Sequence, residues 1–138
     1  MKDIAELSAN LLMHESSKDI VVVGLSPAKR ESRDSRDTSH NLKYFMGTAG
    51  YPKYSSFNIS TIPGGTFEDV DLDYVKTKIQ AFKGKKIIAL GRDVEKALNK
   101  VGVKDFLFIN HTSRRNRFYN KFEHVLKTVI DIRHYLES

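Results

Sequence analysis

The sequence predicts a three-layer α/β/α sandwich with a small, mainly parallel four-stranded sheet. Four short apolar runs alternate with segments of helical periodicity, a pattern typical of parallel sheets that are covered by helices. The first run, "IVVV", is continuously apolar, as expected of a strand that is buried on both faces. With 138 residues, of which 40% are hydrophobic, the chain is long enough to bury one core, and no linker divides it. We therefore expect a single domain over residues 1–138.

The first half of the chain contains two expected strands. An amphipathic helix ending near "HESS" is expected at the N-terminus from apolar residues at helical spacing: Ile4, Leu7, Leu11 and Leu12. The run "DIVVVGLSP" predicts the first strand, closed by Gly24 and Pro27. Residues 28–54 are polar, charged and irregular, which predicts a long loop. The run "SFNISTI" then predicts the second strand, which "PGG" stops.

The second half alternates more regularly. Residues 67–82 have helical periodicity, with acids in the first turn and lysines later, as the helix dipole favours. "KKIIALG" predicts a third strand, "RDVEKALNKVG" a helix that Gly102 ends, and "DFLFIN" a fourth strand that runs into His111. A last helix is expected over residues 117–136, with one apolar side formed by Phe118, Phe122, Val125, Val129 and Ile132.

Charge and composition limit the function. The net charge of +6 and the sequence pI near 9.5 favour an acidic partner, such as nucleic acid or an anionic surface, although basic domains without such a partner exist. The absence of cysteine excludes disulfides, cysteine-ligated zinc and iron–sulfur clusters. No apolar run approaches the length of a membrane span, and the N-terminus carries acids where a signal peptide is basic. We expect a cytoplasmic protein without membrane contact.

Common cofactor and catalytic patterns are missing from the sequence. It contains no G-x-x-x-x-G-K-[ST] or G-x-G-x-x-G phosphate loop, and no serine in a G-x-S-x-G elbow. The five histidines show no H-E-x-x-H or comparable metal-ligand spacing, and His124 and His134 are expected on the surface of the last helix. We therefore expect neither a metal nor a cofactor.

Unusual residues accompany every expected strand. "GLSPAKR" follows the first, Asn58 lies in the second, "GRD" follows the third and "HTSRRNR" follows the fourth. Ligands of open parallel sheets bind beyond the carboxyl ends of the strands, so these residues are expected to converge on one edge. Singly, each also fits a structural role: Asn58 and His111 as partners of backbone groups, Gly24 and Pro27 as turn residues. The cations of "RRNR" oppose the dipole of the helix they precede, which favours a bound anion.

Read in order, five segments resemble motifs of the uracil-DNA glycosylase superfamily, most closely its two branches of prokaryotic iron–sulfur glycosylases. "VVVGLSPAK" resembles the opening G-x-x-P-G or G-L-A-P-A motif, and "FMGTAG" an F-x-G-x-A-G-like segment after a polar loop. "FNISTIPGG" resembles a strand with an asparagine that a proline follows, and "IIALGRDVEKAL" the next strand. "HTSRRNR" resembles the last motif, H-P-S or H-P-x with a following arginine or asparagine. The resemblance spans residues 20–117.

The resemblance implies a uracil-DNA glycosylase-like fold and a role for each matching residue. It implies a base pocket lined by Gly24, Leu25, Ser26 and Pro27. Phe45 would stack on the base, Asn58 would read its pairing edge, and His111 would donate a hydrogen bond to the base oxygen where negative charge develops. The DNA would be contacted by Lys29, Arg30, Ser113, Arg114, Arg115, Asn116 and Arg117.

The chain departs from the family pattern at three points. Ser26 stands where the best-known members carry an aspartate or asparagine that handles the attacking water. Asp34 or Asp37 in the following segment is then the candidate general base, although acids among arginines also form solvated ion pairs. Thr112 replaces the usual proline, and the cysteines that would hold the cluster are absent, so the resemblance implies no cluster here.

Three functions fit the sequence. The first is a monofunctional DNA glycosylase, without metal, that flips uracil or a related damaged or modified base and hydrolyses its N-glycosidic bond. The second is a catalytically inactive member of the fold that binds DNA, a modified base or a nucleotide, which Ser26 and the short chain favour. The third is a basic α/β domain whose partner is another protein. The motifs favour the first, with single- or double-stranded DNA as the partner.

Overall fold

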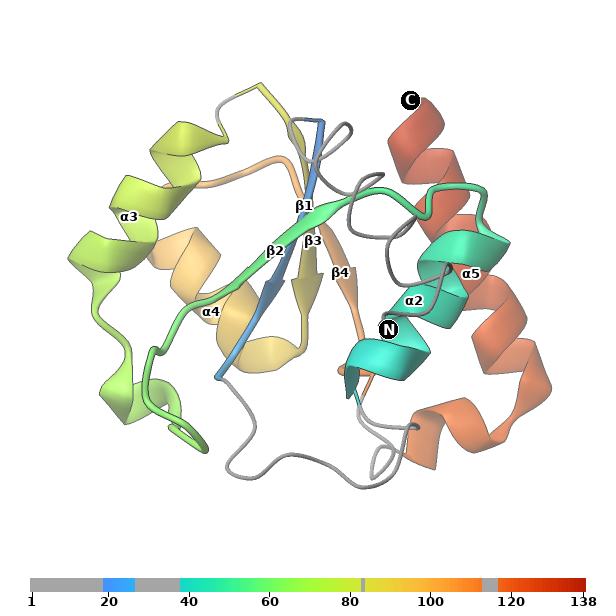
Figure 1. Cartoon of the computed structure of the whole chain (residues 1–138), viewed down its shortest axis with the longest axis horizontal. Helices are drawn as coiled ribbons and strands as arrows, with labels where there is room; N and C mark the ends of the chain where they lie inside the picture. Colours follow the sequence, from blue (N-terminus) through green and yellow to red (C-terminus); the bar gives the residue numbers. More distant parts are fainter. Residues whose placement is uncertain (1–18, 27–37, 83, 113–116) are drawn as a thin grey trace, which may run out of the picture.

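The computed structural model describes residues 19–26, 38–82, 84–112 and 117–138, which form a four-stranded sheet with helices on both faces (Figure 1). The strands are β1 (Ile20–Gly24), β2 (Ser55–Asn58), β3 (Lys86–Leu90) and β4 (Leu107–Ile109). Their order is β2-β1-β3-β4, and every pair of neighbours is parallel. The expected small parallel α/β sheet is confirmed, although β2 and β4 are shorter than the apolar runs that predict them.

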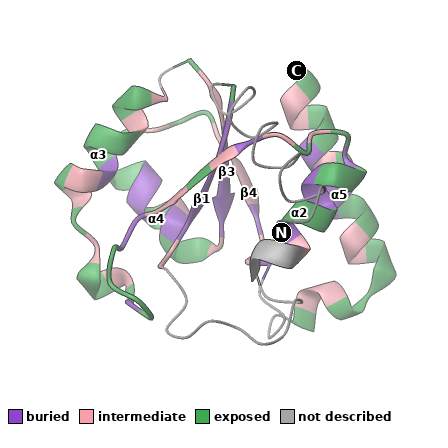
Figure 2. Ribbon diagram, viewed as in Figure 1, coloured by how far each residue is buried: buried purple, intermediate pink, exposed green. Residues whose placement is uncertain are grey.

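Helices cover the sheet in two pairs, which makes three layers. They are α2 (Thr38–Thr48), α3 (Leu72–Ala81), α4 (Arg92–Lys100) and α5 (Phe122–Glu137). α2 and α5 pack on one face of the sheet, and α3 and α4 pack on the other (Figure 1). Side chains of a strand point alternately to the two faces, so Ile20 and Val22 face the first pair while Val21 and Val23 face the second. All five residues of β1 are therefore buried (Figure 2), which explains its continuous apolar run.

The long loop expected over residues 28–54 is wrong, because α2 lies within it. The helix and the residue after it bury four side chains at the i, i+3, i+4 and i+7 spacing of an amphipathic helix: Leu42, Phe45, Met46 and Ala49. This short pattern is hidden in the sequence by polar neighbours. Gly50, at a φ of +94°, ends the helix as a left-handed residue. The N-terminal helix expected near Leu7 lies outside the described residues.

Two expected helices are each divided into a short 3₁₀ turn and a shorter α-helix. The segment over residues 67–82 consists of η1 (Phe67–Asp69) and α3, and the side chain of Asp71 caps the first turn of α3. A capping aspartate starts a new helix because it satisfies N–H groups that have no partner within the helix. The last helix is likewise preceded by η2 (Arg117–Asn120), and α5 starts only at Phe122.

The expected apolar side of the last helix is right for Val129 and Ile132 and wrong for Phe122. Val129 and Ile132 are buried against the sheet, whereas Phe122 is 75% exposed. The buried residues of α5 begin more than one turn beyond Phe122, so its ring lies outside the core. His124, expected at the surface, is half-buried, and its ring stacks on that of Phe118 with 4.1 Å between the centroids. Within the residues that the structure describes, every helix is too short or too polar to span a membrane.

Candidate functional site at the carboxyl edge of the sheet

The carboxyl ends of the four parallel strands meet at one edge of the sheet. The chain that leaves β1 goes on to α2 on one face, whereas β3 leads into α4 on the opposite face. The two connections therefore diverge between neighbouring strands, and ligands of open parallel sheets bind at such a point. Polar residues that end or follow the strands are Ser26, Asn58, Ser60, Asn110 and His111.

Asn58 and Gly24 form a close pair at the ends of β2 and β1. They are register partners in the parallel ladder. The side-chain amide of Asn58 lies over the glycine, since a Cβ built on Gly24 would be only 2.6 Å from Asn58 Oδ1. No larger residue fits at position 24 unless the amide moves. Gly24 therefore makes room for the amide of Asn58, which leans toward the divergence point and is half-buried.

A tight turn after β2 supports this part of the edge. Ser60 is buried, and its Oγ accepts a hydrogen bond from the backbone N–H of Ile62 at 3.2 Å. The N–H of Gly65 donates to the carbonyl of Ile62 at 2.8 Å, and a Cβ on Gly65 would lie 2.6 Å from Ser60 Oγ. Ser60 and Gly65 are therefore structural residues of the turn, while Ile62 at its start is half exposed.

The segment after β4 is held on both sides of His111. The hydroxyl of Tyr119 in η2 donates to the carbonyl of Asn110 at 2.7 Å. The amide Nδ2 of Asn41 in α2 donates to the carbonyl of Thr112 at 2.8 Å. Thr112 itself is completely buried. These two hydrogen bonds fix the backbone from which the imidazole projects.

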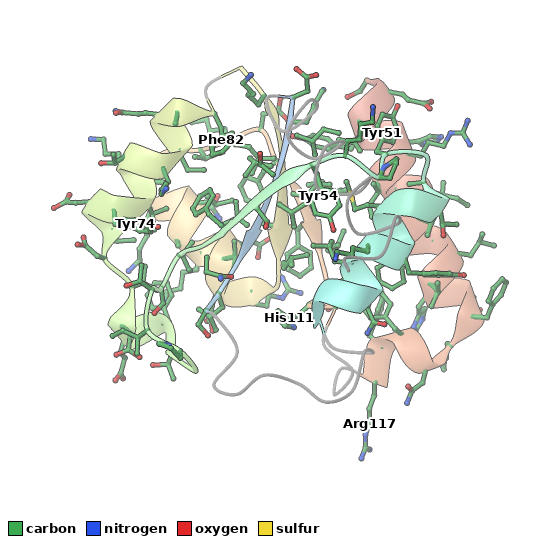
Figure 3. All side chains as sticks on the ribbon, viewed as in Figure 1. Tyr51, Tyr54, Tyr74, Phe82, His111 and Arg117 are labelled. Atoms are coloured by element: carbon green, nitrogen blue, oxygen red, sulfur yellow. The ribbon has the colours of Figure 1, made fainter. Side chains whose placement is uncertain are left out.

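His111 packs beside Gly91, the residue that leads from β3 into α4. A Cβ on Gly91 would lie 3.5 Å from His111 Cβ and 4.0 Å from Cδ2, and Gly91 has a φ of +92°. Burial lowers the pKa of His111 from its ordinary value of 6.5, so the neutral imidazole predominates at pH 7. A neutral imidazole has one N–H donor and one acceptor nitrogen. Figure 3 shows His111 at the lower end of the strands, where their carboxyl ends lie.

Phe45 lies in the core rather than at an open surface. Its side chain is 4% exposed, and its ring packs against Tyr119 with 4.8 Å between the centroids. The expectation that Phe45 stacks on a base does not fit this burial, because the ring is already covered by protein. Phe45 instead supports Tyr119, whose pKa burial raises to about 12.

The other expected site residues fall into two groups. Leu25 and Ser26 are half-buried after β1, and Arg117 is exposed at the start of η2, at the same end of the molecule as His111 (Figure 3). The rest lie outside the described residues: Pro27, Lys29, Arg30, Asp34, Asp37, Ser113, Arg114, Arg115 and Asn116. Asn41 and Tyr119 were not expected from the sequence, because only their contacts with the backbone beside His111 reveal them.

Asn58 and His111 approach the divergence point from opposite sides. They belong to β2 and to the segment after β4, which are the two edge strands, so roughly 14 Å of sheet separates their backbones. Each side chain lies against the glycine that ends or follows the adjacent inner strand, Gly24 or Gly91. The arrangement places an amide and a neutral imidazole at the same edge of the sheet, on either side of the divergence point. Among the described residues, no group of three or more His, Cys, Asp or Glu side chains could hold a metal ion.

The fold and this edge define a small parallel α/β protein with a polar site at the carboxyl ends of its strands. Compared with known proteins, the chain matches no protein-family model and no curated protein sequence. Its function therefore has to be inferred from the residues of the site.

Proposed function

We propose that this protein is DNA glycosylase-like: it takes uracil or a related modified or damaged base out of DNA and hydrolyses the N-glycosidic bond. The observation that carries the proposal is the pair of Asn58 and His111 on either side of the divergence point. An amide offers both a donor and an acceptor, the combination needed to read the pairing edge of a base. The imidazole N–H offers a donor to an oxygen of the same base.

The proposed reaction divides the chemistry between the base and the sugar. The bond between the base nitrogen and the sugar C1′ breaks, and its electron pair leaves with the base. Water adds to C1′ and loses a proton, for which Asp34 or Asp37 is the candidate acceptor. A fixed, neutral His111 N–H stabilises the negative charge that develops on the base oxygen, and removing one such donor typically costs about 10²–10³ in rate. This hydrolysis requires neither a metal nor a redox cofactor.

The distribution of charge supports a DNA partner. Residues 27–37 contain four cations and three acids, and residues 113–117 contain three arginines and no acid. These two segments together contribute +4 to the net charge of +6. Both begin at the carboxyl edge, since one follows Ser26 after β1 and the other follows Thr112 after β4. Cations in segments that start from this edge suit contact with phosphates, which supplies affinity without sequence preference.

The proposal is tested by measuring base release from oligonucleotides that contain uracil, hypoxanthine, xanthine or 5-hydroxymethyluracil. We expect abasic sites with the wild type and a loss of about 10²–10³ in rate with His111→Ala. Asn58→Ala should lower release as well, because the base loses its amide partner. His134→Ala is the matched control, since this histidine is exposed on α5 and should leave release unchanged. Equal release by the wild type and both site variants would refute the proposal.

A catalytically inactive protein that binds DNA, a modified base or a nucleotide at the same site is the second candidate. Ser26 favours it, because a serine rather than a carboxylate follows β1 in the half-buried part of the edge. Salt-sensitive binding of the same oligonucleotides without abasic sites would select this function over catalysis. For either function, a reducing cytoplasm suits a sequence that lacks cysteine.

A further inference from the structure

We infer that Phe122 is a stacking platform for an unpaired base, so that the protein binds single-stranded or locally unpaired DNA beside the base site. The inference rests on the proposed function and adds the substrate class. Phe122 is 75% exposed, the highest value among the large exposed hydrophobic residues of the described chain. A phenyl ring so exposed contributes little to the core. The ring is therefore available to contact a ligand.

Phe122 stands at the end of the molecule where the carboxyl ends of the strands lie. It is the first residue of α5 and is separated only by Lys121 from η2, which lies at the lower end of the view in Figure 1. The hydroxyl of Tyr119 in η2 donates a hydrogen bond to the carbonyl of Asn110, the residue before His111. The Nδ1–H of His124 donates to the carbonyl of Phe118 at 2.7 Å, and the two rings stack. These contacts hold the segment that precedes Phe122. Binding a ligand there therefore requires less additional ordering of the chain.

The charge around Phe122 identifies the kind of partner. Residues 112–122 contain four cations and no acid, and one acid, Glu123, directly follows Phe122. Lys121 immediately precedes Phe122, and Arg117 begins η2; both are exposed, and neither forms an ion pair within the described part of the chain. An exposed aromatic ring among cations suits a strand of nucleic acid, whose bases stack on the ring while its phosphates meet the cations.

Further along α5 the surface is different. Leu126 and Ile130 are also exposed, at 47% and 45%, and continue the apolar stripe away from the cationic segment. In the neighbouring row of the helix, Lys127 pairs with Asp131 at 3.0 Å, so this pair is balanced in charge. The pair beside Leu126 and Ile130 is thus balanced, whereas the segment that leads into Phe122 has an excess of positive charge, which favours a nucleic-acid strand there over an apolar protein partner.

Stacking on Phe122 requires a base whose face is free. In a duplex both faces of an internal base are covered by its neighbours, and exposing one costs a few kcal/mol. This cost is lower in a single strand, whose bases are unpaired. We therefore infer that one base enters the site between Asn58 and His111 while an unpaired base nearby in the same strand stacks on Phe122.

The chain contains no tryptophan, so a tryptophan introduced at position 122 reports on stacking by itself. Phe122→Trp and, as the matched control one turn along the same helix, Leu126→Trp are titrated with an oligothymidylate of roughly 12 nucleotides, within the usual site sizes. We expect the fluorescence of Phe122→Trp to be quenched on binding and that of Leu126→Trp to change little. Equal quenching of both variants, or none in Phe122→Trp, would overturn the inference.

Affinity gives a second, independent measurement. Phe122→Ala should weaken binding of the oligothymidylate by roughly 5-fold to 150-fold, the equivalent of about 1–3 kcal/mol for one stacked base, with little change for the matching duplex. Leu126→Ala should leave both affinities unchanged. Circular dichroism of the two variants verifies that each is folded.

The outcomes separate this inference from the proposed function. Base release that depends on His111, together with wild-type binding of the single strand by Phe122→Ala, would overturn the stacking role alone. Selective loss of single-strand binding in Phe122→Ala would support the stacking role even if no base is released, in which case glycosylase chemistry alone is excluded. A wild-type protein that binds no oligonucleotide would overturn both.

Discussion

The two ends of the parallel sheet are formed by the same four strands but are closed in different ways. At the amino end, the hydroxyl of Tyr135 accepts a hydrogen bond from the N–H of Ile87 at 3.0 Å. Lys86 Nζ there donates to Ser138, and the ammonium lies 5.0 Å from the centre of the Tyr135 ring. At the carboxyl end, the corresponding tyrosine contact holds the backbone of Asn110, and the next residue, His111, packs beside Gly91.

The difference shows how one sheet can be stable at one end and available for binding at the other. At the amino end, the side chains of Tyr135 and Lys86 join α5 to the strands, so these side chains have a structural role. At the carboxyl end, Gly24 makes room for the amide of Asn58, and Gly91 adopts a φ of +92° beside His111. We therefore expect substitutions at the amino end to change stability, and substitutions at the carboxyl end to change the proposed base release.

The largest effect should come from the core that both ends share. Ile88 lies in the central strand β3 and is completely buried between the sheet and the α2 and α5 layer. Ile88→Ala leaves a cavity and should lower the free energy of unfolding by about 2–5 kcal/mol. Urea denaturation measures this loss. A loss below about 1 kcal/mol, the typical cost of an ordinary point mutation, would show that the core is not packed as described.

The next largest effect should come from Gly24→Ala. The added Cβ would lie 2.6 Å from Asn58 Oδ1, so the amide has to move away from the base site. Base release should fall about ten-fold, as expected for losing one hydrogen bond of about 1.4 kcal/mol. Gly47→Ala is the matched control, because a Cβ there meets nothing within 4 Å, and it should leave release unchanged. Equal release by both variants would mean that Asn58 does not contact the base.

A matched pair of tyrosine variants separates the two ends directly. Tyr119→Phe and Tyr135→Phe each remove a hydroxyl that bonds to strand or strand-end backbone, and each should lower the free energy of unfolding by about 1 kcal/mol. Only Tyr119→Phe should also reduce base release, because it frees the carbonyl next to His111. Urea denaturation and base release are measured on both proteins. Parallel losses of release in the two variants would remove the distinction between the ends.

The smallest effect concerns pH. Burial lowers the pKa of His111 below 6.5, so below that pH the unfolded chain binds a proton more readily than the folded chain. The contribution of His111 to the free energy of unfolding should therefore be constant above about pH 7. It should fall as the pH drops through 6.5 toward the lowered pKa. His111→Gln should make the profile flatter between about pH 7 and pH 5. If stability depends on pH in this variant as it does in the wild type, His111 does not cause the loss of stability below about pH 7.

Local patterns predict most of the strands and helices but misplace several boundaries. The run "IVVVG" is apolar because β1 is covered on both faces, and Gly102 ends α4 at a φ of +87°, a conformation that glycine adopts without strain. By contrast, α2 is hidden among polar residues, and Asp71 divides a segment whose periodicity is continuous. Periodicity reports which face of a segment is buried, whereas caps and chain direction depend on single residues.

The sequence was sufficient to predict that Asn58 and His111 lie at one edge of the sheet. His111 follows an expected strand and Asn58 lies within another, and parallel strands bring their carboxyl ends together. Only the structure shows that β2 ends at Asn58. Their surroundings depend on contacts between residues far apart in the chain: Asn41 with the carbonyl of Thr112, and Tyr119 with Phe45. Folding also buries Phe45 and leaves Phe122 exposed, although both are phenylalanines in amphipathic helical segments. Hydrophobicity favours burial of any phenylalanine equally, and only the packing of the helices on the sheet selects which ring is covered.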